Sequence, residues 1–490
     1  MSTHRPNIVV MKFGGTSVED AAAILRTASI VSSRVRKHLR PIVVVSAMSR
    51  VTDTLLAAAS FAGKNSREDA LKLSDSLRTR HLTTAAELVS TSDLLTSLQL
   101  DIHQAFDTLD DLLRGISAVG ELTPRTSDNV VSFGERLSSV LVAAAFVQHG
   151  IPSAHIDARS VIITDNHYGK AAPQEHAIEA ALNAHVLPLV DLAKVPVIGG
   201  FIGSCEVPGA DARITTTLGR GGSDYTAALV GGALHAGAIE IWTDVNGIMT
   251  TDPRVVPEAL RVKTISFEEA AELAYFGAKV LHPATILPAV QKNIPVFVLN
   301  SRNAENEGTK ITATPPPCAS PFKSIAAKKK LTIIDIVASR MLLAHGFLAA
   351  VFAIFDKHKC AIDMVSTSEI SVSVTVDSRE ALPAICADLS QIADVKYESN
   401  KALICLVGED IRGISGISGQ VFSAISHVNI RMISQGASEI NMSFMINEED
   451  VDEAIRSLHK KFFSSPDPNI FDTDSQAVPT KNLAADLSPR

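Results

Sequence analysis

Cysteine is scarce in this 490-residue sequence, and its five cysteines include no CxxC pair. Zinc sites and disulfide frameworks usually depend on such spacing, so neither is expected. Long apolar runs are also missing, because charged residues or proline interrupt each stretch before the roughly 18 residues that a membrane helix needs. The N-terminus, MSTHRPN, has no apolar segment of the kind found in signal peptides. These absences predict a cytoplasmic protein with reduced cysteines.

Long basic segments are absent as well. The formal net charge is −8 at pH 7, which disfavours nucleic acid and anionic membranes as main partners. No GxxxxGK[ST] motif is present and no complete GxGxxG follows a strand-like run, so neither a P-loop nor a dinucleotide-binding fold is indicated. With 46% hydrophobic residues, the chain can bury a large core over about two to four domains. A small molecule is the expected substrate.

Strand-like apolar runs alternate with longer helical stretches up to about residue 310. The runs are NIVVMKF, PIVVVSAM, SAHIDA, VPVIGGFIG, EIWTDV and PVFVLN. Strands that are apolar on both faces and separated by helices are typical of a parallel or mixed sheet in an α/β layer fold.

The runs stop between Ser66 and Gly120, where apolar residues recur at helical spacing. These residues are Phe106, Leu109, Leu113 and Ile116. We expect a helical excursion that ends near LTPRTSDN, where Ser127 or Asp128 could cap the next helix.

The C-terminal third contains an internal repeat. Proline in ATPPPCASP, 313–321, disfavours both helix and strand and indicates a linker. Beyond it, the 32 residues from Gly346 align without gaps on those from Gly416, 70 residues later. This spacing fits two small βαββαβ modules. The expected divisions are a first domain over 1–312, a linker over 313–330, modules over 331–400 and 401–465, and a flexible tail over 466–490.

Three glycine-centred segments lie at strand ends or before helices. They are KFGGTS (12–17), GGFIG (199–203) and TTLGRGGSDYTA (216–227). Glycine allows backbone amides to approach a ligand closely, and a helix N-terminus adds partial positive charge, so such turns can hold phosphate. Each turn alone could be only a tight connection. A fixed ammonium at Lys12 among these amides would stabilise the charge of a phosphoryl group in transfer.

Together with SFGERLS, WTDVNGIMTTDPRVV and FGAKVLHPATI, these segments resemble, in order, the aspartate kinases of the amino-acid kinase superfamily. The paired repeats resemble the ACT modules of the same family. The resemblance implies an α/β, carbamate-kinase-like three-layer sandwich followed by two ferredoxin-like ACT domains. It also implies transfer of the ATP γ-phosphoryl group to the β-carboxylate of L-aspartate, giving 4-phospho-L-aspartate, at the first step of lysine, threonine, methionine and diaminopimelate biosynthesis. Mg²⁺ would be held by phosphate oxygens and water.

The resemblance also implies roles for individual residues. The expected catalytic residues are Lys12 and Asp224. The expected aspartate-binding residues are Ser46, Thr52, Glu135, Phe201, Arg220 and Ser223. The expected ATP-binding residues are Lys12, Gly14, Gly15, Thr243, Asp244, Met249, Arg254 and Lys279. Arg220 would hold the α-carboxylate of aspartate and Glu135 its α-ammonium, while Asp224 would orient Lys12. Alternatively, Asp224 could simply cap the following helix.

The first repeat resembles the lysine-inhibited class of aspartate kinases. The implied effector residues are Met341, Phe347, Leu348, Ile362, Asp363, Thr367, Ser368 and Glu369. Asp363 and Glu369 would be suitable partners for the ammonium groups of lysine. Ala344 and Ala361 stand where serine is frequent in the family, which weakens the case for lysine specifically, so the identity of the effector stays open. A homodimer or dimer of dimers through the ACT domains is implied.

Two alternatives remain at this point. The chain could be another enzyme of the superfamily, acting on glutamate, acetylglutamate or uridylate. It could also be an amino-acid sensor with a decayed kinase half, although Lys12, Arg220, Asp224 and Lys279 are all present.

Overall fold

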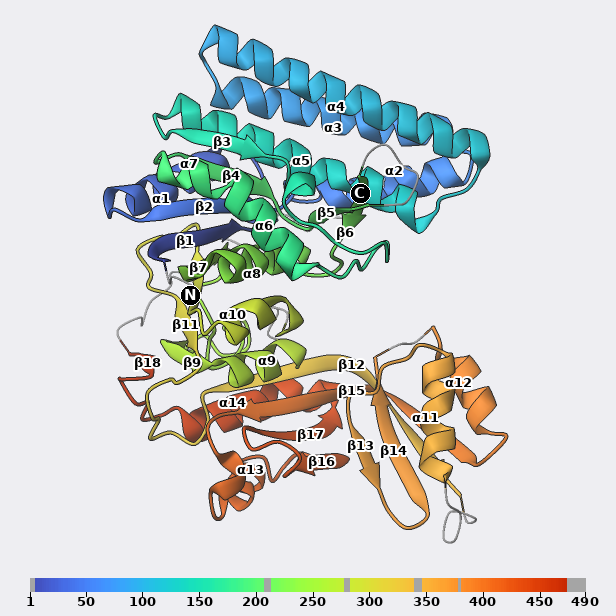
Figure 1. Ribbon diagram of the computed structural model, residues 1–490. Helices are drawn as coiled ribbons and strands as arrows, with labels where there is room; N and C mark the ends of the chain where they lie inside the picture. Colours follow the sequence, from blue (N-terminus) through green and yellow to red (C-terminus); the bar gives the residue numbers. More distant parts are fainter. Residues whose placement is uncertain (1–4, 207–212, 277–282, 339–345, 378–379, 474–490) are drawn as a thin grey trace. The chain divides into compact units, whose positions relative to one another are not determined.

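The computed structural model describes residues 5–206, 213–276, 283–338, 346–377 and 380–473 (Figure 1). The chain forms two compact units. The first unit contains Met1–Gly247 and Val280–Pro315, and the second contains Ile248–Lys279 and Pro316–Arg490.

The first unit is built on a sheet with the strand order β3-β4-β2-β1-β7-β10-β11. Neighbours are parallel from β3 to β10, and β11 is antiparallel to β10. The strands are β1 (Arg5–Phe13), β2 (Arg40–Val45), β3 (Ser153–Ile156), β4 (Val195–Gly199), β7 (Ala236–Thr243), β10 (Val296–Asn300) and β11 (Thr309–Thr312). All six strand-like runs of the sequence fall on this sheet, and VPVIGGFIG continues into the hairpin of β5 (Ile202–Cys205) and β6 (Ile214–Thr217). The predicted sheet is confirmed.

Helices cover both faces of this sheet, as the three-layer prediction requires. In β1, alternate residues Val9, Met11 and Phe13 belong to the main core cluster, which also includes residues of α1 and α5. Val10 faces the opposite side, where its Cγ2 lies near Gly231 of α8. The helices are α1 (Ala21–Arg36), α5 (Pro124–Gln148), α6 (Glu175–His185), α7 (Leu187–Asp191), α8 (Gly222–Leu234) and α10 (Leu287–Gln291), with short 3₁₀ turns at Gly15–Ser17, Ala158–Ser160 and Pro283–Ile286. Because strand side chains alternate between faces, Lys12 projects on the α8 side.

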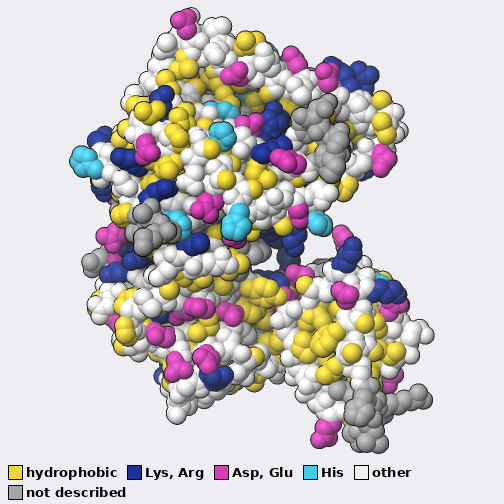
Figure 2. Space-filling view, viewed as in Figure 1, with side chains coloured by type: hydrophobic (Ala, Val, Ile, Leu, Met, Phe, Trp, Pro, Cys, Tyr) yellow, Lys and Arg dark blue, Asp and Glu magenta, His cyan; other side chains and the backbone are white. Residues whose placement is uncertain are grey.

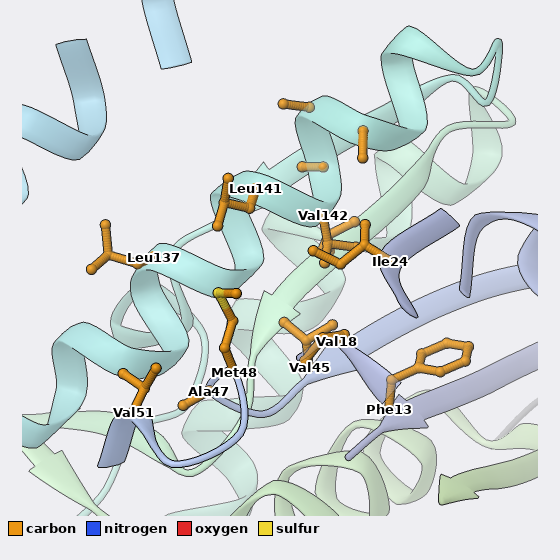
Figure 3. Packing of buried hydrophobic residues seen from close by; sticks show 14 of the residues in the cluster. Phe13, Val18, Ile24, Val45, Ala47, Met48, Val51, Leu137, Leu141 and Val142 are labelled. Carbon is orange, nitrogen blue, oxygen red and sulfur yellow. The ribbon is translucent and has the colours of Figure 1, made fainter. Parts of the chain in front are cut away.

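The expected helical excursion is present as α2 (Val51–Gly63), α3 (Arg67–Leu88) and α4 (Ser92–Val119). Its predicted apolar residues on α4 are all buried. Figure 3 shows how the core continues to α5, where Leu137, Leu141 and Val142 lie near Met48 and Ile24.

Helix α5 is long and apolar enough to cross a membrane, yet 83% of its most apolar window is buried inside the protein, as in a core helix. It starts one turn earlier than the sequence suggested. Thr123 is its N-cap and accepts a hydrogen bond from the Thr126 amide at 3.2 Å. The expectation of a cap at Ser127 or Asp128 is therefore wrong. Pro124 at the first helical position explains the earlier start, since proline is preorganised there and needs no amide partner.

The second unit contains a sheet with the order β13-β14-β12-β15-β17-β16, in which neighbouring strands are antiparallel. The strands are β12 (Ser324–Val337), β13 (Val365–Thr367), β14 (Ser371–Val376), β15 (Asp394–Val407), β16 (Met432–Gln435) and β17 (Asn441–Asn447). The helices are α11 (Phe347–Lys357), α12 (Leu382–Leu389), α13 (Ile417–Ala424) and α14 (Val451–Phe462), with 3₁₀ turns at Ile411–Gly413 and Glu448–Asp450. The repeat is confirmed, because α11, β13 and β14 recur as α13, β16 and β17.

Both repeats open their first helix in the same way. Gly346 and Gly416 are the N-cap residues of α11 and α13, with φ of +88° and +77°. Only glycine adopts this backbone region without steric cost, which explains why both copies carry it.

Three boundaries differ from the sequence prediction. Strand β12 begins at Ser324, so the second part of the expected linker is a strand. Residues 248–279, expected in the first domain, pack in the second unit and form β8 (Arg261–Val262), β9 (Thr264–Ser266) and α9 (Phe267–Tyr275). The prediction of a flexible tail over 466–490 is wrong for the described residues up to 473. There β18 (Phe471–Asp472) pairs with β8, and Phe471 is fully buried.

We expect deletion of residues 466–490 to destabilise the second unit. The deletion removes buried Phe471 and the ion pair of Asp472 with Arg261, whose atoms lie 2.8 Å apart. Phe471→Ala alone should cost about 3–5 kcal/mol of unfolding free energy. Deletion of 474–490 is the matched control, and equal unfolding midpoints for the two truncations in urea would contradict the packing role of β18.

Candidate active site

Lys12 and Asp224 form the centre of the candidate site. Lys12 lies near the C-terminal end of β1, and its Nζ is 2.7 Å from Oδ1 of Asp224 in the first turn of α8. The two side chains are 11% and 14% exposed. The N-cap of α8 is Gly221, at φ +73°, and no side chain caps this helix. Asp224 is therefore a partner of Lys12, as the resemblance implied, and it does not cap α8.

Two glycines at the end of β4, Gly199 and Gly200, allow this strand, α5 and α8 to approach one another closely. A Cβ on Gly199 would lie 2.9 Å from the backbone oxygen of Glu135, and one on Gly200 would lie 2.7 Å from the Cβ of Ser223. Both distances are shorter than real Cβ contacts, so any side chain would force α5 and α8 away from the sheet. These glycines bring Glu135 and Ser223 to the strand end.

Glu135, on α5, is a buried carboxyl group with an open hydrogen-bonding position. Burial raises its pKa to about 8, against the opposing effects of the Ala47 backbone amide and of Lys12. Its Oε2 is buried and has no hydrogen-bond partner among the residues that the structure describes. A buried acceptor next to a fixed cation, with one oxygen unpaired, suits a ligand that brings its own positive charge.

Phe201 and Arg220 stand on either side of the β5–β6 hairpin. Phe201 has φ of +66°, and its amide donates to Thr226 Oγ1 at 3.0 Å. Arg220 precedes α8 and is exposed, and its guanidinium has no ion pair among the residues that the structure describes. Such a guanidinium can bind a carboxylate in the bidentate manner.

Ser46 and Thr52 occupy the connection between β2 and α2. The Ser46 amide donates to the backbone oxygen of Phe13 at 3.0 Å, and its own backbone oxygen accepts from Ser138 Oγ at 2.7 Å. Thr52 lies in the first turn of α2 and is half-buried. The structure therefore fixes the Ser46 backbone between β1 and α5.

Asp128 is a residue of this region whose role the sequence analysis missed. Its carboxylate accepts hydrogen bonds from the amides of Gly169 and Thr217, at 2.8 and 2.9 Å, and from Thr217 Oγ1 at 2.8 Å. Its side chain thus joins the 165–172 loop to the end of β6, directly before the turn that carries Arg220. The partners are 41 and 89 residues away in the chain, so no local motif could reveal the contact.

The expected nucleotide residues are divided between the two units. In the first unit, the Gly14 amide donates to the Trp242 oxygen at 3.1 Å, and Thr243 and Asp244 follow at the end of β7. Gly15 approaches the Ala47 oxygen so closely that a Cβ there would lie at 3.1 Å.

In the second unit, the backbone oxygen of Met249 accepts from Ser324 Oγ. Arg254 is 88% exposed and paired with Asp252. Lys279 lies outside the described residues.

The expected effector residues lie in the first repeat. Phe347 and Leu348 are in the first turn of α11, Ile362 packs on the module core, and Met341 lies outside the described residues. Asp363 has only 4% of its side chain exposed and is 2.7 Å from Lys328. Thr367, Ser368 and Glu369 are exposed at the end of β13.

Comparison with known families defines the class of protein. Residues 7–300 match the amino acid kinase family, and residues 334–387 and 404–462 match an ACT domain. This agrees with the three-layer unit and the repeated second unit, so the chain has the fold of an amino acid kinase followed by ACT domains.

Comparison with individual proteins shows which family within this class the chain belongs to. The chain is 37% identical to lysine-sensitive aspartokinase 3 of Escherichia coli, over 93% of this chain and 99% of that protein. It is 38% identical to the chloroplastic aspartokinase 1 of Arabidopsis thaliana, over 94% and 80%. The structure of E. coli aspartokinase III in complex with aspartate and ADP matches with a TM-score of 0.79 and 36% identity, over 93% of this chain and 100% of that chain. The chain belongs to the aspartokinases, and neither alternative from the sequence is favoured.

We expect Asp128→Ala to lower kcat/KM for the amino-acid substrate. Alanine removes the acceptor of the Gly169 and Thr217 amides, which costs about 1–3 kcal/mol per unsatisfied group and frees the turn before α8. A decrease of about tenfold, mostly in KM, is expected from steady-state kinetics. Thr217→Val, which removes only one of the three hydrogen bonds, should have a smaller effect, and Asp111→Ala on the exposed face of α4 should have none. An unchanged KM in Asp128→Ala would contradict the positioning role.

Proposed function

We propose that this aspartokinase transfers the γ-phosphoryl group of ATP to the β-carboxylate of L-aspartate, forming 4-phospho-L-aspartate, the first step of lysine, threonine, methionine and diaminopimelate biosynthesis. The observation that carries the proposal is the Lys12–Asp224 ion pair next to the buried, half-satisfied carboxyl of Glu135. The relative of known structure with aspartate and ADP supports it.

The reaction needs charge stabilisation more than proton transfer. The acceptor carboxylate is already ionised at neutral pH, so no general base is required. The Lys12 ammonium, held by Asp224, would stabilise the charge on the non-bridging oxygens of the transferring phosphoryl group. Because Asp224 fixes the ammonium at 2.7 Å, little reorganisation would be needed during transfer.

The two ends of aspartate would be held by groups of opposite charge. Arg220 would bind the α-carboxylate and Glu135 the α-ammonium, while Ser46, Thr52, Phe201 and Ser223 would line the pocket. The exposed guanidinium of Arg220 and the unpaired Oε2 of Glu135 support this assignment. The opposite charges orient the substrate so that its β-carboxylate points to Lys12.

The proposed ATP contacts are Lys12, Gly14, Gly15, Thr243, Asp244, Met249, Arg254 and Lys279. Arg254 would exchange Asp252 for a phosphate. Mg²⁺ would come with the nucleotide, bound by phosphate oxygens and water, since the described residues contain no group of three or more His, Cys, Asp or Glu side chains placed to hold an ion.

Regulation by lysine is the second part of the proposal. The relative from E. coli is lysine-sensitive, and its structure with lysine and aspartate matches this chain with a TM-score of 0.80. Lysine would bind in the first ACT module, with Asp363 and Glu369 as partners of its ammonium groups. The remaining effector contacts would be Met341, Phe347, Leu348, Ile362, Thr367 and Ser368.

We further propose a cytoplasmic homodimer or dimer of dimers that forms through the ACT domains. Figure 2 shows hydrophobic side chains on the surface of the module that contains α11 and α12, and Leu348 and Phe352 of α11 are 38% and 39% exposed. Apolar side chains that a single chain leaves in water are available for burial between chains.

Purified protein should convert ATP to ADP with aspartate and not with glutamate or UMP, measured by coupled ADP release. Lys12→Met should lower kcat by about 10²-fold or more, the scale of losing a preorganised charged contact. Lys37→Met, at the exposed C-cap of α1, is the matched control and should keep full activity. Indifference to aspartate would refute the proposed substrate, and a near-normal kcat in Lys12→Met would refute the role of Lys12.

The affinity for aspartate should rise with pH through the pKa of Glu135. A carboxyl group with a pKa of about 8 is neutral below that value, so binding an ammonium requires loss of a proton. kcat/KM for aspartate should therefore increase by up to about tenfold per pH unit below pH 8. Glu135→Gln should remove this dependence and leave KM for aspartate high at every pH. KM for ATP is the internal control, and a pH-independent kcat/KM for aspartate in the native protein would contradict the assignment.

A further inference from the structure

A buried pair of serines lies between two of the turns that are proposed to bind ATP. Ser17, on the short 3₁₀ turn after β1, donates from its hydroxyl to Ser301 Oγ at 2.8 Å, across 284 positions of the chain. The two residues are 1% and 5% exposed, and neither is among the proposed catalytic, substrate or nucleotide contacts. Because a buried hydroxyl is costly unless it is hydrogen-bonded, this contact holds the two segments together.

The hydroxyl of Ser301 extends this contact to the end of β7. It donates to the backbone oxygen of Thr243 at 3.1 Å, and the Ser301 amide donates to the same oxygen at 2.8 Å. Each hydroxyl has a single proton, so Ser17 donates to Ser301 and Ser301 donates to Thr243. The serine pair therefore reaches the backbone of a proposed nucleotide contact directly.

The glycine turn after Lys12 is attached to the same strand end. The Gly14 amide donates to the Trp242 oxygen at 3.1 Å, and Ser17 Oγ donates to that oxygen at 3.4 Å. Ser17 also closes the turn, because its amide donates to the Gly14 oxygen at 2.9 Å. A Cβ on Gly14 would lie 3.6 Å from Lys12 Nζ, so the turn passes beside the proposed catalytic ammonium.

Two further side-chain contacts attach the end of β10 to these turns. Asn300 Nδ2 donates to Asn246 Oδ1 at 2.7 Å, within the segment that follows β7. Arg302 pairs with Glu19 at 3.1 Å, two positions after Ser17. Three consecutive residues at the end of β10 therefore contact both turns.

All of these contacts lie in the first unit, at the carboxyl ends of β1, β7 and β10. These strands are parallel neighbours, so the sheet hydrogen bonds fix the strands relative to one another. The turns beyond the strand ends have left the sheet, and its hydrogen bonds no longer hold them. The serine hydroxyls connect the turns at the edge where ligands bind in open α/β sheets.

We propose that Ser17 and Ser301 are positioning residues that hold the glycine turn and the end of β7 in the relative placement that ATP binding requires. The hydroxyls act through the backbone of Gly14 and of Thr243. Because the two turns are held together before ATP binds, little ordering is needed on binding. This inference rests on the proposed binding of ATP by these two turns.

The test compares nucleotide affinity with aspartate affinity in the full-length protein. ADP binding is measured by calorimetry, and the KM values for ATP and aspartate are measured by ADP release. Ser301→Ala removes a donor and an acceptor, so ADP binding should weaken and KM for ATP should rise, each by about tenfold. Ser17→Ala removes only the donor to Ser301 and should change both by about threefold. KM for aspartate should stay within about twofold of the native value in each variant.

The double variant shows whether the two hydroxyls act as one unit. Residues in one hydrogen-bond network give non-additive effects on free energy. Ser17→Ala combined with Ser301→Ala should therefore bind ADP within about twofold of Ser301→Ala alone. Multiplication of the two single effects would overturn the inference, because the serines would then act independently.

Trp242 reports whether the surrounding core is intact in these variants. It is the only tryptophan in the chain, and its ring is fully buried and stacked on Phe13 with the centroids 6.0 Å apart. Its fluorescence emission maximum should therefore keep the native wavelength in all serine variants. A red-shifted emission together with weaker ADP binding would indicate a merely structural role and would overturn the inference.

Ser33→Ala is the matched control, because Ser33 Oγ donates within α1, to the Ile30 oxygen at 2.7 Å. This variant should behave as the native protein. Native-like ADP affinity in Ser301→Ala would overturn the inference. A native protein that binds ADP but does not phosphorylate aspartate would instead refute the proposed substrate, and the ADP affinities of the variants would still decide the role of the serines.

Discussion

The ion pair between Lys12 and Asp224 is the constraint on which the candidate site depends. A lysine at the end of a buried parallel strand must face either a helix or solvent, and the alternation of β1 directs it to the α8 face. Asp224 meets it there at 2.7 Å, in the first turn of α8. The ammonium is therefore fixed at the carboxyl ends of the strands, where ligands bind in open α/β sheets.

The elements around this pair are arranged by close backbone approach. Gly199 and Gly200 lack the side chains that would separate the strand end from α5 and α8. Without side chains at these two positions, Glu135 lies close enough to Lys12 for the ammonium to lower the pKa of Glu135. Burial has the larger effect and raises this pKa to about 8, so Glu135 is largely protonated at neutral pH. The site is thus prepared for one anion and one ammonium, which are the groups that an amino-acid substrate carries besides its reacting carboxylate.

Local patterns predicted the sheet, the helical excursion and the repeat, whereas the Lys12–Asp224 pair was implied by the resemblance to the aspartate kinases. β-Branched runs and short glycine motifs lie within a few residues of one another, so they can be recognised without knowledge of the fold. Asp128 could not be recognised, because its hydrogen bonds reach Gly169 and Thr217. The same reason explains the error about the C-terminal tail. Phe471 is buried through its pairing with Val262, more than 200 residues earlier, and its polar neighbours in the sequence suggested a mobile segment.

The packing of residues 248–276 decides which of the proposed contacts belong to one unit. Glu269 and Lys323 form an ion pair with side chains 2% and 0% exposed, and separating such a pair leaves an uncompensated buried charge that costs about 3–5 kcal/mol. The start of α9 is therefore firmly attached to β12. Its C-terminal part is held as well, because Leu273 and Phe276 are 1% and 8% exposed and the Tyr275 hydroxyl donates to Asp363. Residues that sequence reasoning placed in the kinase domain are thus part of the unit with the ACT repeats, and this unit contains both the proposed effector residues and the proposed ATP contacts Met249 and Arg254.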